Sequence, residues 1–198
     1  MDHKKKSILE LTRCSVAQYR SMNKLPLSVL TDNVRSMHNI GSIFRTADAF
    51  RVEEVILGGI SGCPPHPEIS KSALGAEESV AWRHVEDSLA ELIKKQREGW
   101  KICVLEQTHN SIRLQDFNPF KKDPKDPKDP KDFNALKSPK KPLKLILVVG
   151  NEVKGVDQRI VDMADYILEI PQEGTKHSLN VSTSAAITLF HLYLLLKI

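Results

Sequence analysis

Two strongly apolar runs constrain the fold of this chain more than any other feature of its sequence. KICVLE (101–106) and LKLILVVG (143–150) are rich in β-branched residues, which is typical of strands buried on both faces of a parallel sheet. Further strands are predicted at 27–31, 52–59, 80–85 and 166–170, and helices at 39–50, 87–100 and 182–197. Strands that alternate with helices predict an α/β fold with a mainly parallel sheet flanked by helices.

The cysteine and hydropathy patterns bear on the cellular compartment. Cys14, Cys63 and Cys103 are widely spaced and form no CxxC pair, which favours a reducing environment over a disulfide scaffold. The N-terminus lacks the apolar core of a signal peptide, and AAITLFHLYLLL near the C-terminus is shorter than the roughly 20 residues of a membrane span. No His, Cys and Asp cluster has metal-ligand spacing. We therefore expect a cytoplasmic protein without a metal and without a membrane partner.

Positive charge is concentrated in two segments of the chain. The net charge is +4, yet residues 1–24 hold six Lys and Arg against two acids, and residues 121–144 hold nine Lys against four Asp. The rest of the chain is therefore acidic, and composition alone supports polyanion binding only weakly. We predict that residues 1–24 form a short basic helical extension and that residues 25–198 form one domain.

A flexible insertion is predicted at about residues 117–142 of that domain. It contains three tandem Lys-Asp-Pro units. A proline at every third position removes backbone donors and excludes both a helix and a sheet ladder. Two alternatives stay open from the residues alone: a solvated loop without a function, or a basic arm that contacts a phosphate backbone.

The first of three unusual polar segments is DNVRSMHNIGSIFRTADAF (32–50). Asn39 and Gly41 open a predicted helix directly after a strand, and Arg45 follows one helical turn later. Free backbone amides at a helix N-terminus, together with an arginine, suit a phosphate or a developing oxyanion. In the alternative interpretation, Asn39 is only a helix cap and Arg45 only a surface ion-pair donor.

Two further polar segments follow strands near the end of the chain. VVGNEVKGV (148–156) matches neither a P-loop nor GxGxxG, and a purely structural turn would need its glycines but not Glu152. EIPQEGTKHSLNVSTSAAITLF (169–190) leads into an apolar helix, for which Ser178, Asn180 and Ser182 are good caps. Open α/β sheets bind ligands at the carboxyl ends of their strands, where these turns are expected to lie.

Together, the three segments resemble the three motifs of the SpoU (TrmH-like) family of RNA ribose 2′-O-methyltransferases, within the SPOUT superfamily. NIGSIFRTADAF resembles the first motif through Asn39 and Arg45, GNEVKGV the second through Glu152, and SLNVSTSAAI the third through Ser178 and Asn180. The similarity runs from about residue 25 to residue 198 apart from the insertion. Thr183 departs from the valine that usually follows NVS in the third motif.

The resemblance implies a fold and a cofactor. The family fold is an α/β sheet with a deep trefoil knot in its C-terminal part, a rare exception to unknotted topology. S-adenosylmethionine binds in that knot between three loops, which correspond here to LEQTHN, GNEVKG and IPQEGTKHSLN. The cofactor-binding residues implied in this way are Leu105, Glu106, Gln107, Thr108, Gly150, Asn151, Glu152, Gly155, Ile170, Pro171, Ser178 and Leu179.

The resemblance also implies catalytic roles. Arg45 would contact the ribose 2′-hydroxyl and the neighbouring phosphate, and because an arginine stays protonated, we expect it to stabilise the forming alkoxide rather than act as a base. Asn39 and Ser178 would orient Arg45 or the sugar, Glu152 would anchor the site through hydrogen bonds, and Asn180 would hold the third motif in shape. The proton acceptor stays open.

The family works as a homodimer in which the first-motif arginine of one subunit completes the site of the other. The apolar final helix agrees with burial from two sides, although a helix buried deeply in one subunit is the alternative. Because the basic N-terminal segment is short, we expect the catalytic domain and its dimer partner to bind the RNA. This favours tRNA over ribosomal RNA as the substrate. The rival function is an RNA-binding protein that keeps the fold without catalysis.

Overall fold

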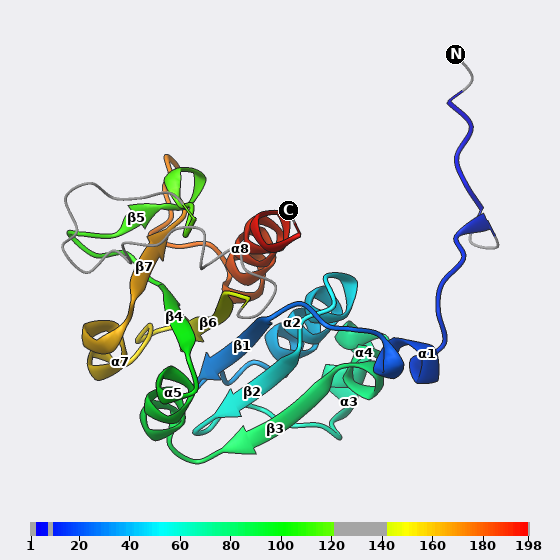
Figure 1. The fold of residues 1–198 in the computed structure, drawn as a ribbon, viewed down its shortest axis with the longest axis horizontal. Helices are drawn as coiled ribbons and strands as arrows, with labels where there is room; N and C mark the ends of the chain where they lie inside the picture. Colours follow the sequence, from blue (N-terminus) through cyan, green and yellow to red (C-terminus); the bar gives the residue numbers. More distant parts are fainter. Residues whose placement is uncertain (1–2, 8–9, 121–141, 198) are drawn as a thin grey trace.

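A computed structural model describes residues 3–7, 10–120 and 142–197 (Figure 1). Its centre is a seven-stranded sheet in the order β3-β2-β1-β6-β4-β7-β5, in which every pairing is parallel. The strands are β1 (Leu27–Asp32), β2 (Glu54–Gly58), β3 (Ala81–Val85), β4 (Trp100–Leu105), β5 (Ile112–Arg113), β6 (Lys144–Gly150) and β7 (Tyr166–Glu169). The predicted α/β fold with a mainly parallel sheet is thus confirmed.

The central strands β1 and β6 are buried on both faces, as their apolar runs predict. They pair in register from Leu27 opposite Leu145 to Asp32 opposite Gly150. Because both strands end at the same level, the loops that follow them start side by side. The first and second polar segments of the sequence are therefore neighbours in space.

Helices cover both faces of the sheet (Figure 1). On one face, α2 (Met37–Ala49) contacts α3 (Pro67–Ala73), α4 (Ala76–Ser79) and α8 (Val181–Leu196), and α1 (Val16–Ser21) packs on α4. On the other face lie α5 (Ser88–Arg97) and α7 (Gln158–Met163). Alternate strand residues feed the two cores: Leu27 and Val29 of β1 pack toward α2 and α8, whereas Leu30 packs toward α5 and α7.

The ends of the predicted helices shift by a few residues because side chains cap them. Ser36, and not Asn39, is the N-cap of α2, since its hydroxyl accepts a hydrogen bond from the Asn39 backbone N–H at 3.3 Å. The interpretation of Asn39 as a cap is therefore wrong. Asn180 caps α8 by accepting hydrogen bonds from the N–H groups of Ser182 and Thr183, as its residue type predicts.

The N-terminal segment is attached through α1, whose Ser15 and Gln18 form a capping box. Tyr19 is buried, and the Arg20 Nε donates to the Glu78 carbonyl oxygen at 3.0 Å. At the start of the insertion predicted at about 117–142, Phe117 is instead buried, and its ring packs on that of Tyr166 with 5.0 Å between the ring centroids. The Lys-Asp-Pro units lie outside the described residues. Among the described residues, no helix is long and apolar enough to cross a membrane.

Candidate cofactor-binding and catalytic site

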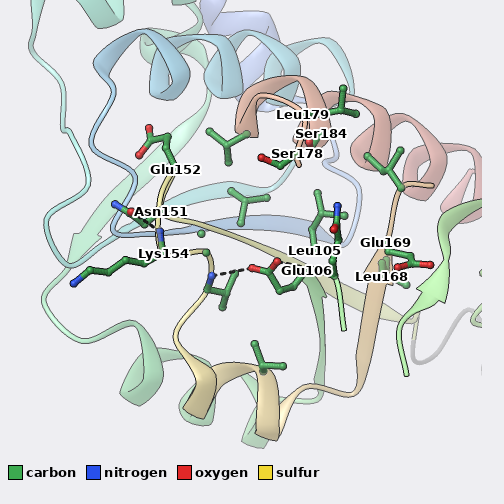
Figure 2. Close-up of a pocket in the computed structure, with 18 of the residues that line it drawn as sticks. Leu105, Glu106, Asn151, Glu152, Lys154, Leu168, Glu169, Ser178, Leu179 and Ser184 are labelled. Atoms are coloured by element: carbon green, nitrogen blue, oxygen red, sulfur yellow. Dashed lines mark hydrogen bonds between the residues drawn. The ribbon is translucent and has the colours of Figure 1, made fainter. Parts of the chain in front are cut away.

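A cavity of about 630 Å³ lies at the carboxyl ends of β4, β6 and β7, next to the start of α8 (Figure 2). Three stretches provide its polar wall: the loop after β4, the loop after β6, and the segment between β7 and α8. Its volume lies within the range of about 300–1,000 Å³ that is common for small-molecule sites. The position follows from the parallel sheet, because loops that leave neighbouring strands at one edge enclose a crevice.

Nearly all residues that the resemblance assigns to the cofactor line this cavity. These are Leu105, Glu106, Gln107, Thr108, Gly150, Asn151, Glu152, Gly155, Ile170, Ser178 and Leu179. Pro171 does not line it, whereas its neighbour Gln172 does. The prediction omitted the apolar floor, which includes Val149 and Leu168. The only sequence signal for those two residues is that each lies in the apolar run of a predicted strand.

The loop after β6 is held in a tight turn that only glycine permits. A Cβ at Gly150 would overlap the Gly155 carbonyl carbon and the Val156 nitrogen, and Gly155 has φ +70°. The Asn151 and Gly155 backbones exchange two hydrogen bonds, at 3.0 and 2.9 Å. The Asn151 side chain fixes the outer part of the turn by accepting from the N–H groups of Val153 and Lys154, both at 3.0 Å.

Glu106 places a fixed carboxylate in the cavity wall (Figure 2). One oxygen accepts from the Gln107 N–H at 3.0 Å and the other from the Val156 N–H at 3.1 Å, so the carboxylate joins the loops after β4 and β6. Nearby in sequence, the buried Thr108 hydroxyl has no hydrogen-bond partner among the described residues. A buried hydroxyl without a partner is costly, which fits a ligand that bonds to it.

The three polar segments meet at Asn39. Its side-chain Nδ2 donates to the Glu152 Oε1 at 3.0 Å, and its Oδ1 accepts from the Asn180 Nδ2 at 3.0 Å. Glu152 also accepts from the backbone N–H groups of Arg35 at 3.2 Å and Ser36 at 3.1 Å. One asparagine amide therefore links residues that are 113 and 141 positions away in the chain.

The pKa of Glu152 lies below its ordinary value. Partial burial acts to raise this pKa, but the hydrogen bonds from the Asn39 amide and from backbone N–H groups, including those of Ser36 and Arg35, outweigh that effect. A carboxylate stabilised in this way is a weak base. Its geometry suits an anchor that accepts hydrogen bonds from several segments rather than a proton acceptor.

Arg45 lies apart both from this hydrogen-bonded junction and from the cavity. Its side chain is exposed on α2, does not line the cavity, and makes no hydrogen bond or ion pair with the residues that the structure describes. The interpretation of Arg45 as a surface ion-pair donor therefore has no support within one subunit. Ser178, in contrast, lines the cavity directly. Within the described ranges, no group of three or more His, Cys, Asp or Glu residues could hold a metal ion.

The sequence model of the SpoU rRNA Methylase family matches residues 26–190. The chain belongs to this family. A "Putative TrmH family tRNA/rRNA methyltransferase" of Staphylococcus saprophyticus is 25% identical over 178 residues, which are 90% of this chain and 62% of the relative. The "23S rRNA (guanosine-2′-O-)-methyltransferase RlmB" of Pseudomonas putida is 28% identical over 166 residues, 83% of this chain and 57% of the relative. The SpoU chain thus spans about three-fifths of these curated relatives.

Solved structures share the fold. The A. aeolicus TrmH/SpoU tRNA modifying enzyme superposes with a TM-score of 0.72 at 24% identity and covers 92% of this chain and 81% of that one. The SpoU methyltransferase AviRb from Streptomyces viridochromogenes, solved in complex with the cofactor AdoMet, has a TM-score of 0.64 at 23% identity, covering 89% and 60%. The match to the family model over residues 26–190 confirms the family resemblance inferred from the three motifs.

Proposed function

We propose that this SpoU family member transfers a methyl group from S-adenosylmethionine to a ribose 2′-hydroxyl of RNA, with tRNA as the substrate. The observation that carries the proposal is the hydrogen-bonded junction of Asn39, Glu152 and Asn180 beside the cavity. Residues of three separate motifs converge there, and Glu152 and Asn180 also line the cavity. This convergence at the cavity supports catalysis over the rival RNA-binding function.

S-adenosylmethionine is the cofactor that fits the cavity. When bound, it supplies an activated methyl group, so the protein has mainly to position the acceptor hydroxyl and stabilise its developing charge. Contacts for an adenosine and an amino-acid moiety are offered by the tight turn at Gly150, by the Thr108 hydroxyl, which has no hydrogen-bond partner among the described residues, and by the Glu106 carboxylate. Backbone groups near Leu105, Ile170 and Leu179 would bind the adenine and the ribose.

Arg45 is exposed and does not line the cavity of its own chain. The helix α8 exposes Ile187, Phe190 and Leu194, which are 41%, 49% and 47% accessible. Their spacing places them on one helical face. This exposure is inconsistent with a terminal helix that is buried within a single subunit. We propose that a second copy covers this face in a homodimer and that its Arg45 stabilises the 2′-alkoxide, while Ser178 orients the sugar. The deep trefoil knot remains part of the proposal.

Incubation of the protein with total RNA and methyl-labelled S-adenosylmethionine tests the function. We expect label in the tRNA fraction, recovered after nuclease digestion as a 2′-O-methylated nucleoside. Arg45→Ala should abolish transfer and leave the dissociation constant for the cofactor nearly unchanged, because Arg45 does not line the cavity. Label on a base, transfer to ribosomal RNA alone, or no binding of the cofactor would each contradict the corresponding part of the proposal.

A further inference from the structure

A second cavity of about 1,020 Å³ lies on the other side of the loop after β6. It is lined by the carboxyl end of β1, by Arg35 and Ser36 before α2, by Ile60 after β2, and by residues 151–158. Residues 151–156 line both cavities, so this loop forms a shared wall. A ligand in the second cavity would therefore lie directly beside a cofactor in the first.

The carboxylates of the second cavity are occupied by partners. Asp32, only 3% exposed, accepts from the Asn33 Nδ2 at 2.9 Å and from the Asp157 N–H at 3.1 Å. Asp157 caps α7 and pairs with Arg159 at 2.6 Å. Glu152 receives its hydrogen bonds from the Asn39 amide and from two backbone N–H groups. Asp32 and Glu152 keep their negative charge, because their donors are neutral N–H groups, but none of the three carboxylates forms an ion pair with Arg35 or Lys154 within the described residues.

The two cations of the second cavity have no such partners. Arg35 and Lys154 are exposed, and neither charged group makes a hydrogen bond or ion pair within the described part of the chain. In Figure 2 the Lys154 side chain extends away from the other labelled residues of the first cavity. The Arg35 backbone N–H donates a hydrogen bond to the Glu152 carboxylate, so the Arg35 side chain extends from a fixed point of the backbone. Two free cations at the edge of a cavity suit phosphate groups.

Two aliphatic side chains that line the same cavity are exposed to solvent. Val153 is 91% exposed and Ile60 is 66% exposed. Their backbones are held rather than loose: Ile60 N–H donates to the Asn33 Oδ1 at 3.1 Å, and Val153 N–H donates to the Asn151 Oδ1 at 3.0 Å. The Asn151 Nδ2 in turn donates to the Asn33 carbonyl at 2.8 Å, which ties the two sides together. Exposed apolar surface in a held position suits the face of a nucleobase.

We propose that the second cavity binds the RNA segment next to the target nucleotide, with its phosphates at Arg35 and Lys154 and a base against Ile60 and Val153. The inference rests on the proposed RNA methyltransferase function and deepens it. Glu152 connects RNA binding in the second cavity with methyl transfer beside the first. The same carboxylate accepts hydrogen bonds from the side chain of the catalytic Asn39 and from the backbone N–H of Arg35. Bound RNA would thereby be set in register with the site of methyl transfer.

The test measures binding of fluorescein-labelled total tRNA by anisotropy as a function of salt. For Arg35→Ala combined with Lys154→Ala, we expect about tenfold weaker binding and a salt slope reduced by roughly 1.5, as for two lost phosphate contacts. Val153→Ser with Ile60→Ser should weaken binding severalfold without changing that slope, since it removes no charge. Lys94→Ala combined with Arg97→Ala is the matched control, because these two exposed cations of α5 line neither cavity, and this variant should behave as the wild type.

Parallel titration with S-adenosylmethionine separates this inference from the function on which it rests. Arg35→Ala should bind the cofactor as the wild type does, because Arg35 does not line the first cavity. Wild-type RNA affinity and salt slope in the double variant would overturn the second cavity as an RNA site while the methyl-transfer proposal stands. A wild-type protein that methylates no RNA would remove the proposed function itself, and the inference with it.

Discussion

At the scale of single residues, Glu152 links stability to pH. Its lowered pKa means that its contribution to folding is fully present above its ordinary value of 4.5 and is lost as the pH falls through the lowered folded value. Glu152→Gln removes the negative charge and keeps one acceptor oxygen, but it replaces the other oxygen with an NH2 donor that would face either the Arg35 N–H or the Asn39 and Ser36 N–H groups. At pH 7 we expect a loss of about 1 kcal/mol, a value discounted for solvent exposure.

Thermal unfolding at several pH values checks this expectation. The difference in Tm between the wild type and Glu152→Gln should shrink once the pH is well below 4.5, because the wild-type carboxyl is then protonated as well. Glu173→Gln, an exposed change in the loop before α8, serves as the control. A Tm difference that stays constant down to acid pH would show that Glu152 does not act through its charge.

Glu106 should distinguish the cofactor from its demethylated product. S-adenosylmethionine carries a positive sulfonium that S-adenosylhomocysteine lacks, and the Glu106 carboxylate is held in the cavity wall by two N–H bonds. In a partly buried cavity a charge pair is weakly screened, so Glu106→Gln should weaken binding of S-adenosylmethionine by about tenfold. Binding of the product should change less. Calorimetric titration measures both constants, and equal losses for the two ligands would refute this role.

At the scale of secondary-structure elements, the turn after β6 should not tolerate a side chain. In Gly150→Ala the new Cβ would collide with the backbone at Gly155 and Val156, which cannot yield as a flexible side chain would. We expect a cost of about 1–3 kcal/mol and the loss of cofactor binding. Gly174→Ala is the matched control, since nothing lies within 4 Å of its Cβ position. Unfolding and cofactor titrations of the two variants test the difference, and equal behaviour would contradict it.

The elements that the sequence predicted correctly are those with strong local signals. The runs that form β4 and β6 are long and β-branched, and α8 carries a good capping residue in Asn180. The short elements α7 and β5 were not predicted. Only Ile160 and Val161 of α7 are buried, and the two residues of β5 are exposed, so neither element has a readable periodicity. Such elements form because the sheet and its neighbours position them.

The candidate site, like the fold, could be predicted only in part. Local patterns indicate its residues, but not the long-range contacts between them. The motif residues Asn39, Glu152 and Asn180 could be singled out, but their contact spans more than a hundred positions and depends on the register of β1 and β6. Glu106 and Thr108 are predicted as cofactor-binding residues through the family resemblance, but the sequence does not show what holds their side chains. The fixed carboxylate and the unpartnered hydroxyl become visible only when the loops after β4 and β6 are brought together.

At the scale of the whole molecule, the proposed homodimer predicts complementation between subunits. Arg45→Ala removes the arginine but leaves its own cavity intact, whereas Gly150→Ala damages the cavity and keeps Arg45. Each variant alone should be inactive in methyl transfer. When the two are unfolded, mixed and refolded, about half of the dimers should be mixed and one of their two sites complete, which restores about a quarter of the activity.

The same mixture separates the dimer from a site that is complete within one chain. If each cavity used its own Arg45, a mixed dimer would contain one site without the arginine and one without the cofactor, and no activity would return. Phe190→Asp in both variants gives the corresponding control, because a charge on the exposed face of α8 should prevent association in a sedimentation experiment. Restored activity that depends on that face would require the arginine of one subunit to act in the cavity of its partner.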